Sequence, residues 1–151
     1  MEQTPTDMLQ DVESELHNEL AGTGQRLANY LIDLLSFYIA LVLIVTLITL
    51  PLDSEAFIDT LEKMPFVMAQ LFALFLYGLY MSIIEGAGKG RTLGKLITST
   101  KAIHESGAPL TWRDAFWRGL VRMIPFEYFS ALGGLPWHDR WTNTRVVKVR
   151  K

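Results

Sequence analysis

The stretch that decides the fold is LLSFYIALVLIVTLITLPL, residues 34–52, in which nineteen residues pass without a charge. A second uncharged run, MPFVMAQLFALFLYGLYMSII, occupies residues 64–84. An α-helix rises about 1.5 Å per residue, so about 20 residues cross the roughly 30 Å hydrocarbon core of a bilayer. A water-soluble chain of 151 residues would bury its core with shorter amphipathic elements. The two runs therefore predict an integral membrane protein.

The topology follows from the two runs and from the distribution of charge around them. We expect transmembrane helices over about residues 27–50 and 65–85, joined by a short acidic loop into an antiparallel hairpin. Residues 89–151 hold twelve of the fourteen basic residues, and basic residues accumulate on the cytoplasmic side of a membrane. Both termini should therefore be cytoplasmic, with the loop at 51–63 outside.

The N-terminal segment, residues 1–23, is predicted to form an acidic amphipathic helix on the cytoplasmic side. Residues 1–25 carry six acidic residues and neither lysine nor arginine. The first Lys or Arg of the chain is Arg26. Anionic lipid should repel such a helix, so a basic protein surface, including the chain's own tail, is the expected partner. The alternative is a partly frayed polar leader. Residues 24–151 then form the membrane domain.

A third helix is expected over about residues 111–132, with an apolar aromatic face and a side marked by Arg118 and Arg122. If it spanned the bilayer, these arginines would lie at membrane depth and the basic C-terminus would lie outside. An interfacial or re-entrant helix avoids both costs and is favoured. Residues 96–104 and 144–149 read as strands that pair. The expected fold class is an all-α membrane protein: a two-helix transmembrane hairpin, an interfacial or re-entrant third helix and a small cytoplasmic β-element.

Asp33 is the side chain least expected in the first helix. A charge at the centre of a membrane helix costs from about 3 to over 10 kcal/mol, so Asp33 must be partnered, protonated or hydrated. The expected partners are Arg26, or Arg118 and Arg122 from the third helix. Asp33 is then either a structural lock between helices or an ion or proton site, and residue chemistry alone favours the lock.

The basic, glycine-rich turn at residues 86–95 is expected to place Lys89, Arg91 and Lys95 against lipid head groups. It is not a phosphate-binding loop, because Lys89 stands where the outer glycine is needed and Leu96 where Ser or Thr is needed. The chain has no cysteine, and nothing in it combines a nucleophile, a base and an orienting group. We expect no enzyme activity, cofactor, metal site or nucleic-acid partner.

Several short motifs together resemble the RDD family of small bacterial and archaeal membrane proteins, named for one Arg and two Asp. The first Arg and Asp match Arg26 and Asp33, in RLANYLID. The second Asp matches Asp139, in WHDRWTNTRVV at residues 137–147. The stretch RTLGK at 91–95 and the arginines at 113, 118 and 122 also resemble the family pattern. The similarity covers about residues 24–150, in a compact form with a short segment between Arg122 and Asp139.

The resemblance implies location in the bacterial cytoplasmic (inner) membrane and a role in transport of a small cation or proton. Arg26, Asp33 and Asp139 would then carry a net charge of −1 when ionised. Two spanning helices cannot enclose a polar path alone, so transport requires a homo-oligomer or other membrane proteins. The first hypothesis is a subunit of an oligomeric small-cation or proton transporter. The second is a non-catalytic membrane scaffold or accessory subunit of a larger complex.

Overall fold

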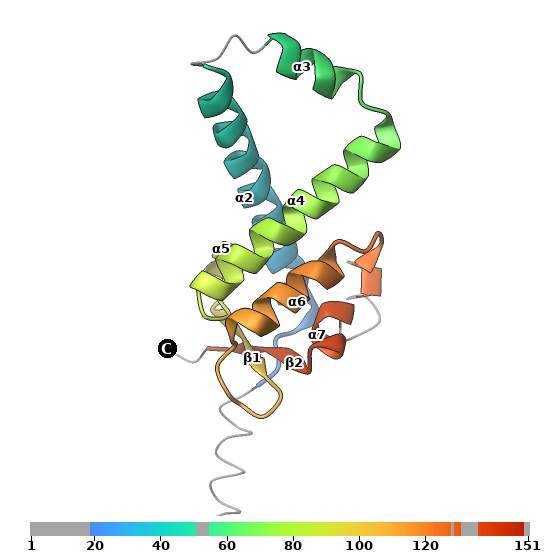
Figure 1. The fold of residues 1–151 in the computed structure, drawn as a ribbon. Helices are drawn as coiled ribbons and strands as arrows, with labels where there is room; N and C mark the ends of the chain where they lie inside the picture. Colours follow the sequence, from blue (N-terminus) through green and yellow to red (C-terminus); the bar gives the residue numbers. More distant parts are fainter. Residues whose placement is uncertain (1–18, 51–54, 128, 131–135, 150–151) are drawn as a thin grey trace, which may run out of the picture.

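The structure is a computed structural model that describes residues 19–50, 55–127, 129–130 and 136–149. Its elements in chain order are α2 (Thr23–Thr49), α3 (Glu55–Glu62), α4 (Phe66–Ala87), α5 (Leu93–Ile97), β1 (Thr100–His104), α6 (Trp112–Arg122), α7 (Trp137–Trp141) and β2 (Thr144–Lys148). α2, α3 and α4 form the upper part of the molecule, and the remaining elements form a body below them (Figure 1).

The two long helices, α2 and α4, are the ones expected from the uncharged runs, and both are long and apolar enough to cross a membrane. α2 begins four residues earlier than expected, after an extended Gly22 whose N–H donates to the Gln25 side chain at 3.1 Å. The helices meet where the Ser36 and Tyr80 hydroxyls lie 3.0 Å apart and then diverge towards α3 (Figure 1). α3 is a short helix that the sequence did not predict, because the segment 51–63 was read only as a loop.

α6 packs along α4 through glycines that face each other. A Cβ atom at Gly119 would lie 1.8 Å from the Ser82 hydroxyl oxygen and 2.5 Å from the Gly78 carbonyl oxygen. A Cβ atom at Gly78 would lie 2.6 Å from the Gly119 carbonyl oxygen. The small residues Gly78 and Ser82 of α4 thus lie against α6. Glycine pairs allow such close approach of two helix backbones.

The predicted strand pair is confirmed. β1 and β2 form a two-stranded antiparallel sheet in which Thr100 lies opposite Lys148 and His104 opposite Thr144. The first strand begins later than expected, since residues 93–97 form α5. Thr92 caps that helix by accepting a hydrogen bond from the Lys95 N–H, a capping signal that outweighs the β-favouring residues that follow.

The N-terminal helix expected at residues 1–23 falls mostly outside the described residues. Of that segment, residues 19–22 are not helical but run beside β2. The Ala21 N–H donates to the Val146 carbonyl at 2.9 Å, and Glu19 pairs with Lys148 at 2.6 Å. These residues therefore contact the chain's own basic C-terminal segment, as the charge pattern suggested.

The third helix is shorter than the expected span of 111–132. α6 ends at Arg122, and residues 123–127 continue as turns towards the next segment. Pro125 follows three residues after the end of α6, and a proline cannot donate the backbone hydrogen bond that would continue the helix. Eleven residues span only about 16 Å, about half of a hydrocarbon core, so α6 as it stands is too short to cross a bilayer.

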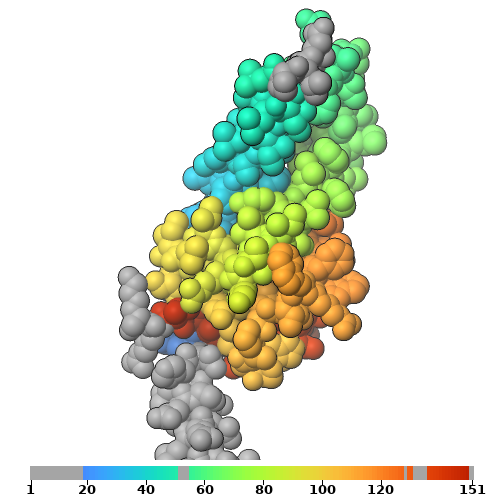
Figure 2. Space-filling model, turned by 60° about the vertical axis from the view of Figure 1, so that its left-hand side comes forward, coloured from blue at the N-terminus to red at the C-terminus, as the bar shows by residue number. Residues whose placement is uncertain are grey.

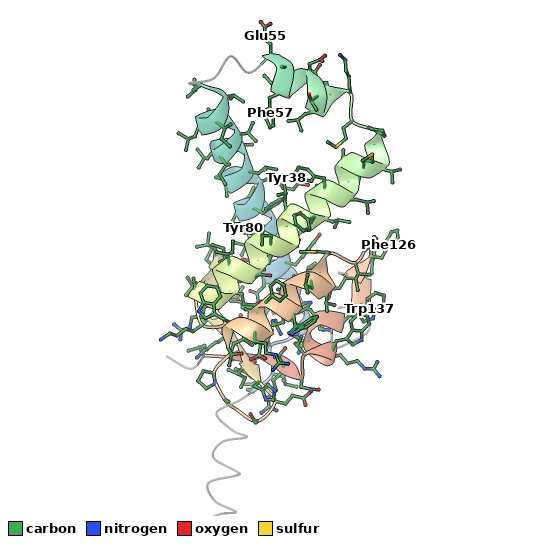
Figure 3. All side chains as sticks on the ribbon, viewed as in Figure 1. Tyr38, Glu55, Phe57, Tyr80, Phe126 and Trp137 are labelled. Carbon is green, nitrogen blue, oxygen red and sulfur yellow. The ribbon has the colours of Figure 1, made fainter. Side chains whose placement is uncertain are left out.

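The body has small apolar clusters in its interior, but the long helices expose most of their apolar side chains and bury polar ones. The buried residues of α2 are Asn29, Asp33 and Phe37, while leucines such as Leu35 and Leu47 are more than half exposed. Apolar side chains project outward from both long helices, and Phe126 and Trp137 project from the body below (Figure 3). The space-filling view shows the same upper arm of α2 and α4 above a broader base (Figure 2). Water disfavours this arrangement and lipid favours it.

Candidate functional site

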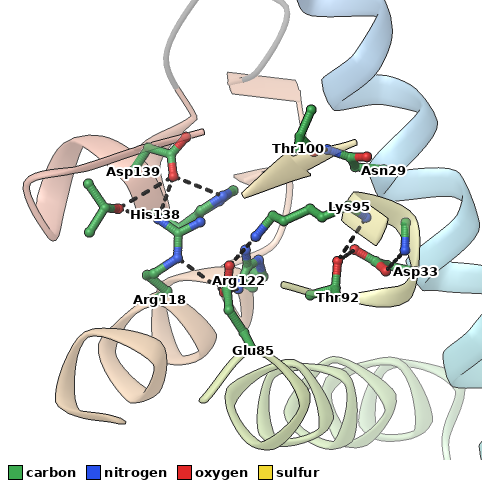
Figure 4. A network of polar contacts seen from close by, with 12 residues as sticks. Asn29, Asp33, Glu85, Thr92, Lys95, Thr100, Arg118, Arg122, His138 and Asp139 are labelled. Carbon is green, nitrogen blue, oxygen red and sulfur yellow. Dashed lines mark hydrogen bonds and ion pairs between the residues drawn. The ribbon is translucent and has the colours of Figure 1, made fainter. Parts of the chain in front are cut away.

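Asp33 is buried at the point where α2 meets α5. Its side chain is 3 % exposed and accepts hydrogen bonds from the Thr92 hydroxyl at 2.6 Å and the Gly94 N–H at 2.8 Å (Figure 4). The sequence predicted an arginine partner for Asp33. The two donors that the structure supplies are both uncharged, and Arg118 and Arg122 bind other carboxylates. Asp33 thus ties α2 to the turn that follows α4.

Glu85, Lys95, Arg118, Arg122 and Asp139 form a buried set of ion pairs, which we call the charged layer. Glu85 is at its centre and was not among the residues predicted from sequence. Its carboxylate is fully buried and accepts from Arg118 Nε at 3.1 Å and from Arg122 Nη1 at 2.8 Å. The Lys95 ammonium donates to its other oxygen (Figure 4). The available signal was a lone acidic residue at the end of the second uncharged run, followed by a segment rich in arginine.

Asp139 is the second carboxylate that binds Arg118, and it comes from α7. Arg118 Nη1 lies 2.5 Å from Asp139 Oδ1 and also donates to the Thr144 hydroxyl. Burial raises the pKa of Asp139, but the positive charge of Arg118 and the neighbouring His138 outweigh it, so the pKa is below its ordinary value. Asp139 Oδ2 is buried without a hydrogen-bond partner among the described residues.

The residues predicted from sequence fall into two groups. Arg118, Arg122 and Asp139 meet in the charged layer, whereas Asp33 lies beside it. Lys89 and Arg91 are exposed, as head-group contact requires. Lys95 is not: it is 3 % exposed and pairs with Glu85, because its helix turns it inward. Burial lowers the pKa of the Lys95 ammonium, although Glu85 opposes this effect.

A cavity of about 460 Å³ opens between α2, α4 and the charged layer. Leu34, Phe37 and Leu74 contribute apolar walls. Its acidic, basic and histidine lining residues are Arg26, Asp33, Lys95, Arg122, Glu127, His138 and Asp139. The cavity therefore joins the apolar helices to five of the eight charged residues that the sequence singled out, while Arg118, Lys89 and Arg91 lie outside its lining. Within the described residues, no group of three His, Asp or Glu side chains is placed to hold a metal ion.

His138 closes this end of the cavity by binding Glu127, with Nδ1 2.6 Å from Glu127 Oε1. Its pKa is below the ordinary value of 6.5, because burial and the charge of Arg122 outweigh the carboxylates of Asp139 and Glu127. Burial raises the pKa of Glu127, but the hydrogen bond from His138 and the positive charge of Arg122 lower it overall. The pair is thus arranged as a neutral imidazole that donates to a carboxylate.

Because of the His138–Glu127 pair, we expect the folded protein to lose stability in mild acid. The unfolded chain binds a proton at His138 more readily than the folded protein does. The stabilisation is therefore present above pH 6.5 and is lost as pH falls towards the lower folded pKa. We expect the melting temperature of the detergent-solubilised protein to fall as pH is lowered from about 7.5 to about 5. His138→Gln should flatten this dependence and His104→Gln should leave it intact. An unmodified protein whose melting temperature is constant over this range would contradict the assignment.

Two span-capable helices, an apolar exterior and a buried charged layer are typical of an integral membrane protein. The model of the RDD family matches residues 20–136, so the chain belongs to the RDD family and the resemblance read from the sequence is confirmed. The match includes Arg26 and Asp33 and ends before Asp139. A search of curated proteins and a search of solved structures each found no match.

Proposed function

We propose that the chain is a subunit of an oligomeric membrane transporter for a proton or small cation, with Asp33 as the group that takes up the ion. The observation that carries the proposal is a charge imbalance among the buried side chains. Four carboxylates (Asp33, Glu85, Glu127 and Asp139) and three basic groups (Lys95, Arg118 and Arg122) are buried in the charged layer or beside it. When all are ionised and His138 is neutral, the buried set carries one excess negative charge.

The hydrogen-bond pattern supports the assignment of that excess charge to Asp33. Glu85 binds three basic side chains, Asp139 binds Arg118, and Glu127 binds His138. Among the described residues, Asp33 accepts hydrogen bonds only from a hydroxyl and a backbone N–H, and it lines the cavity. A carboxylate that is hydrogen-bonded to uncharged donors in a site of low dielectric favours binding of a proton or a cation.

The transport proposal requires more than one chain. Two long helices that diverge from their contact cannot surround a polar path, and unsatisfied polar groups in hydrocarbon are too costly to leave exposed. Copies of the chain, or other membrane proteins, would close the cavity on its open side. The distribution of basic residues supports placement in the bacterial cytoplasmic membrane with both termini inside.

Flux measurements on Asp33→Asn test the proposal. In proteoliposomes with an internal pH dye, we expect the unmodified chain to dissipate an imposed pH gradient, with or without an opposing sodium gradient. Asn keeps the size and one acceptor oxygen but cannot carry the charge, so we expect at least a roughly tenfold loss of flux, the usual scale for removal of an essential proton-transfer group. The mass of the particle in native nanodiscs should not change.

The matched control is Asp59→Asn, the same substitution at an exposed acidic residue of α3. It should transport like the unmodified chain. Equal flux in Asp33→Asn and the unmodified chain would refute the role of Asp33.

A membrane scaffold is the second candidate, and the buried ion pairs favour it. They join α4, α5, α6 and α7 into one body, so the same charges are able to serve the fold alone. Under that function neither form of the chain shows flux, and the particle isolated in native nanodiscs contains other proteins in fixed ratio. The two functions therefore differ in both measurements.

A further inference from the structure

α6 turns charged side chains towards the protein and aromatic side chains outward, which is the reverse of a helix on a water-soluble protein. Its buried side carries Arg118, Gly119 and Arg122, which face α4 and the charged layer. Its outward side carries Trp112, which is 61 % exposed, and two further aromatic residues, each 50 % exposed. A helix on a water-soluble protein places its apolar stripe inward. The outward side of α6 therefore fits an apolar environment.

Other segments extend the outward side of α6 into a larger aromatic surface. Trp137 and Trp141 of α7 stack with ring centroids 5.8 Å apart, and Phe126 and Phe129 stack at 6.3 Å. We call the following set the aromatic surface: Trp112, Phe116, Trp117, Phe126, Phe129, Trp137 and Trp141, all at least one third exposed. Exposed apolar patches of this kind mark sites of interaction with a partner or a membrane.

The aromatic surface continues the apolar exterior of α4. A Cβ atom at Gly86, in the last turn of α4, would lie 2.3 Å from the Trp112 ring, so Trp112 lies directly against the end of that helix. The surface thus begins where the span-capable helix ends. Tryptophan is enriched at that depth because its ring is apolar and its N–H needs a polar partner.

A groove of about 290 Å³ lies between α6 and α7. Its lining residues are Trp117, Leu120, Val121, Ile124, Trp141 and Thr142. Exposed basic residues lie on the same elements and on the turn after α4, namely Lys89, Arg91, Arg113 and Arg140. Within the described part of the chain these four side chains form no ion pair with an acidic residue. An apolar groove between two helices that also carry exposed basic residues matches an acyl chain that carries an anionic head group.

We propose that the aromatic surface lies in the membrane–water interface and that the groove between α6 and α7 holds an acyl chain of an anionic phospholipid. α6 reaches only about 16 Å and does not cross the bilayer. Its Arg118 and Arg122 face the protein, its aromatic residues face lipid, and Arg113 with the other exposed basic residues meets phosphate. This lipid site is independent of the transport proposal, because it involves neither Asp33 nor the cavity between α2 and α4.

Intrinsic tryptophan fluorescence tests the depth of the aromatic surface. All four tryptophans of the chain lie on α6 and α7, so their emission reports only on this region. The full chain is reconstituted in phosphatidylcholine vesicles with a minor fraction of phosphatidylglycerol, brominated either near the head group or near the chain end. We expect the strongest quenching from bromines near the head group, with weak quenching by aqueous acrylamide. Strong acrylamide quenching without bromine quenching, or strongest quenching from the chain end, would overturn the interfacial position.

The same fluorescence separates anionic lipid from lipid in general. We expect brominated phosphatidylglycerol to quench about twofold or more strongly than brominated phosphatidylcholine at equal bulk fraction, because basic residues near the surface enrich anionic lipid. The double variant Arg113→Gln/Arg140→Gln should reduce this preference and keep the depth profile. Equal quenching by the two lipids in the unmodified chain would refute the anionic head group.

A single-tryptophan chain tests the groove itself. With Trp112, Trp137 and Trp141 changed to Phe, the remaining Trp117 reports from the groove wall. A matched chain that keeps only Trp112 reports from the aromatic surface outside the groove. We expect stronger bromine quenching of Trp117 than of Trp112. Quenching of Trp112 that equals or exceeds that of Trp117 would refute an acyl chain in the groove.

Discussion

Glu85→Gln is expected to destabilise the folded protein by about 3–5 kcal/mol, the usual cost of removing one partner from a buried ion pair. Glu85 is fully buried and binds the side chains of Lys95, Arg118 and Arg122. The glutamine leaves their positive charges opposed by too few carboxylates in a region from which water is excluded. The free energy of unfolding in mixed micelles, followed by tryptophan emission, measures the effect.

Two comparisons make the Glu85 result specific. Glu62→Gln makes the same chemical change at an exposed residue of α3 and should alter stability by less than about 0.5 kcal/mol. Glu85→Gln/Lys95→Met removes a charge of each sign, so it should be less destabilising than Glu85→Gln alone. If Glu85→Gln were as stable as the unmodified protein, the charged layer would not hold the body together.

Gly119→Ala is expected to have the second largest effect, a loss of about 1–3 kcal/mol from overpacking between α4 and α6. The added methyl group would lie 2.5 Å from the Gly78 carbonyl oxygen, which belongs to the backbone and cannot rotate away. The helices must separate, and that movement also pulls Arg118 away from Glu85. Unfolding in mixed micelles again measures the loss.

Gly24→Ala provides the matched control for this prediction. Gly24 is a helical glycine in the first turn of α2, and a Cβ atom there would meet nothing within 4 Å. Alanine favours helix over glycine by about 1 kcal/mol, so this variant should be neutral or slightly stabilised. Equal stability of Gly119→Ala and Gly24→Ala would mean that close contact between α4 and α6 is unimportant to the fold.

The long helices and the strand pair were predictable because their signals are local. An uncharged run of membrane length marks α2 and α4, and alternation of β-branched residues marks β2. α5 was missed because two contacts support it: the cap at Thr92, and the distant Asp33, which accepts from the Gly94 N–H 61 residues along the chain. Residue propensity around Ile97 favoured a strand, and these two contacts outweigh it.

The sequence predicted which residues belong to the candidate site better than it predicted which of them form pairs. Asp33, Arg118, Arg122 and Asp139 were identified because charges near apolar runs are costly and therefore conspicuous. Their partners depend on how α4 and α6 are rotated, which spacing alone does not specify. Glu85 was overlooked for a related reason: at the end of a predicted span, an acidic residue resembles an ordinary helix terminus.

The long separation between α2's polar groups and their partners has a consequence for how the protein is made. Asp33 depends on Thr92, 59 residues later, and Asn29 is in hydrogen-bond contact with Thr100, 71 residues later. At about 5–20 residues per second, a ribosome needs roughly 3–14 seconds to supply such partners. During that interval the insertion machinery must hold a helix with a carboxylate and an amide that have no partner yet. A nascent chain that stalls before Thr92 therefore carries an exposed polar signal in its first helix, by which membrane quality control is able to distinguish it from the finished protein.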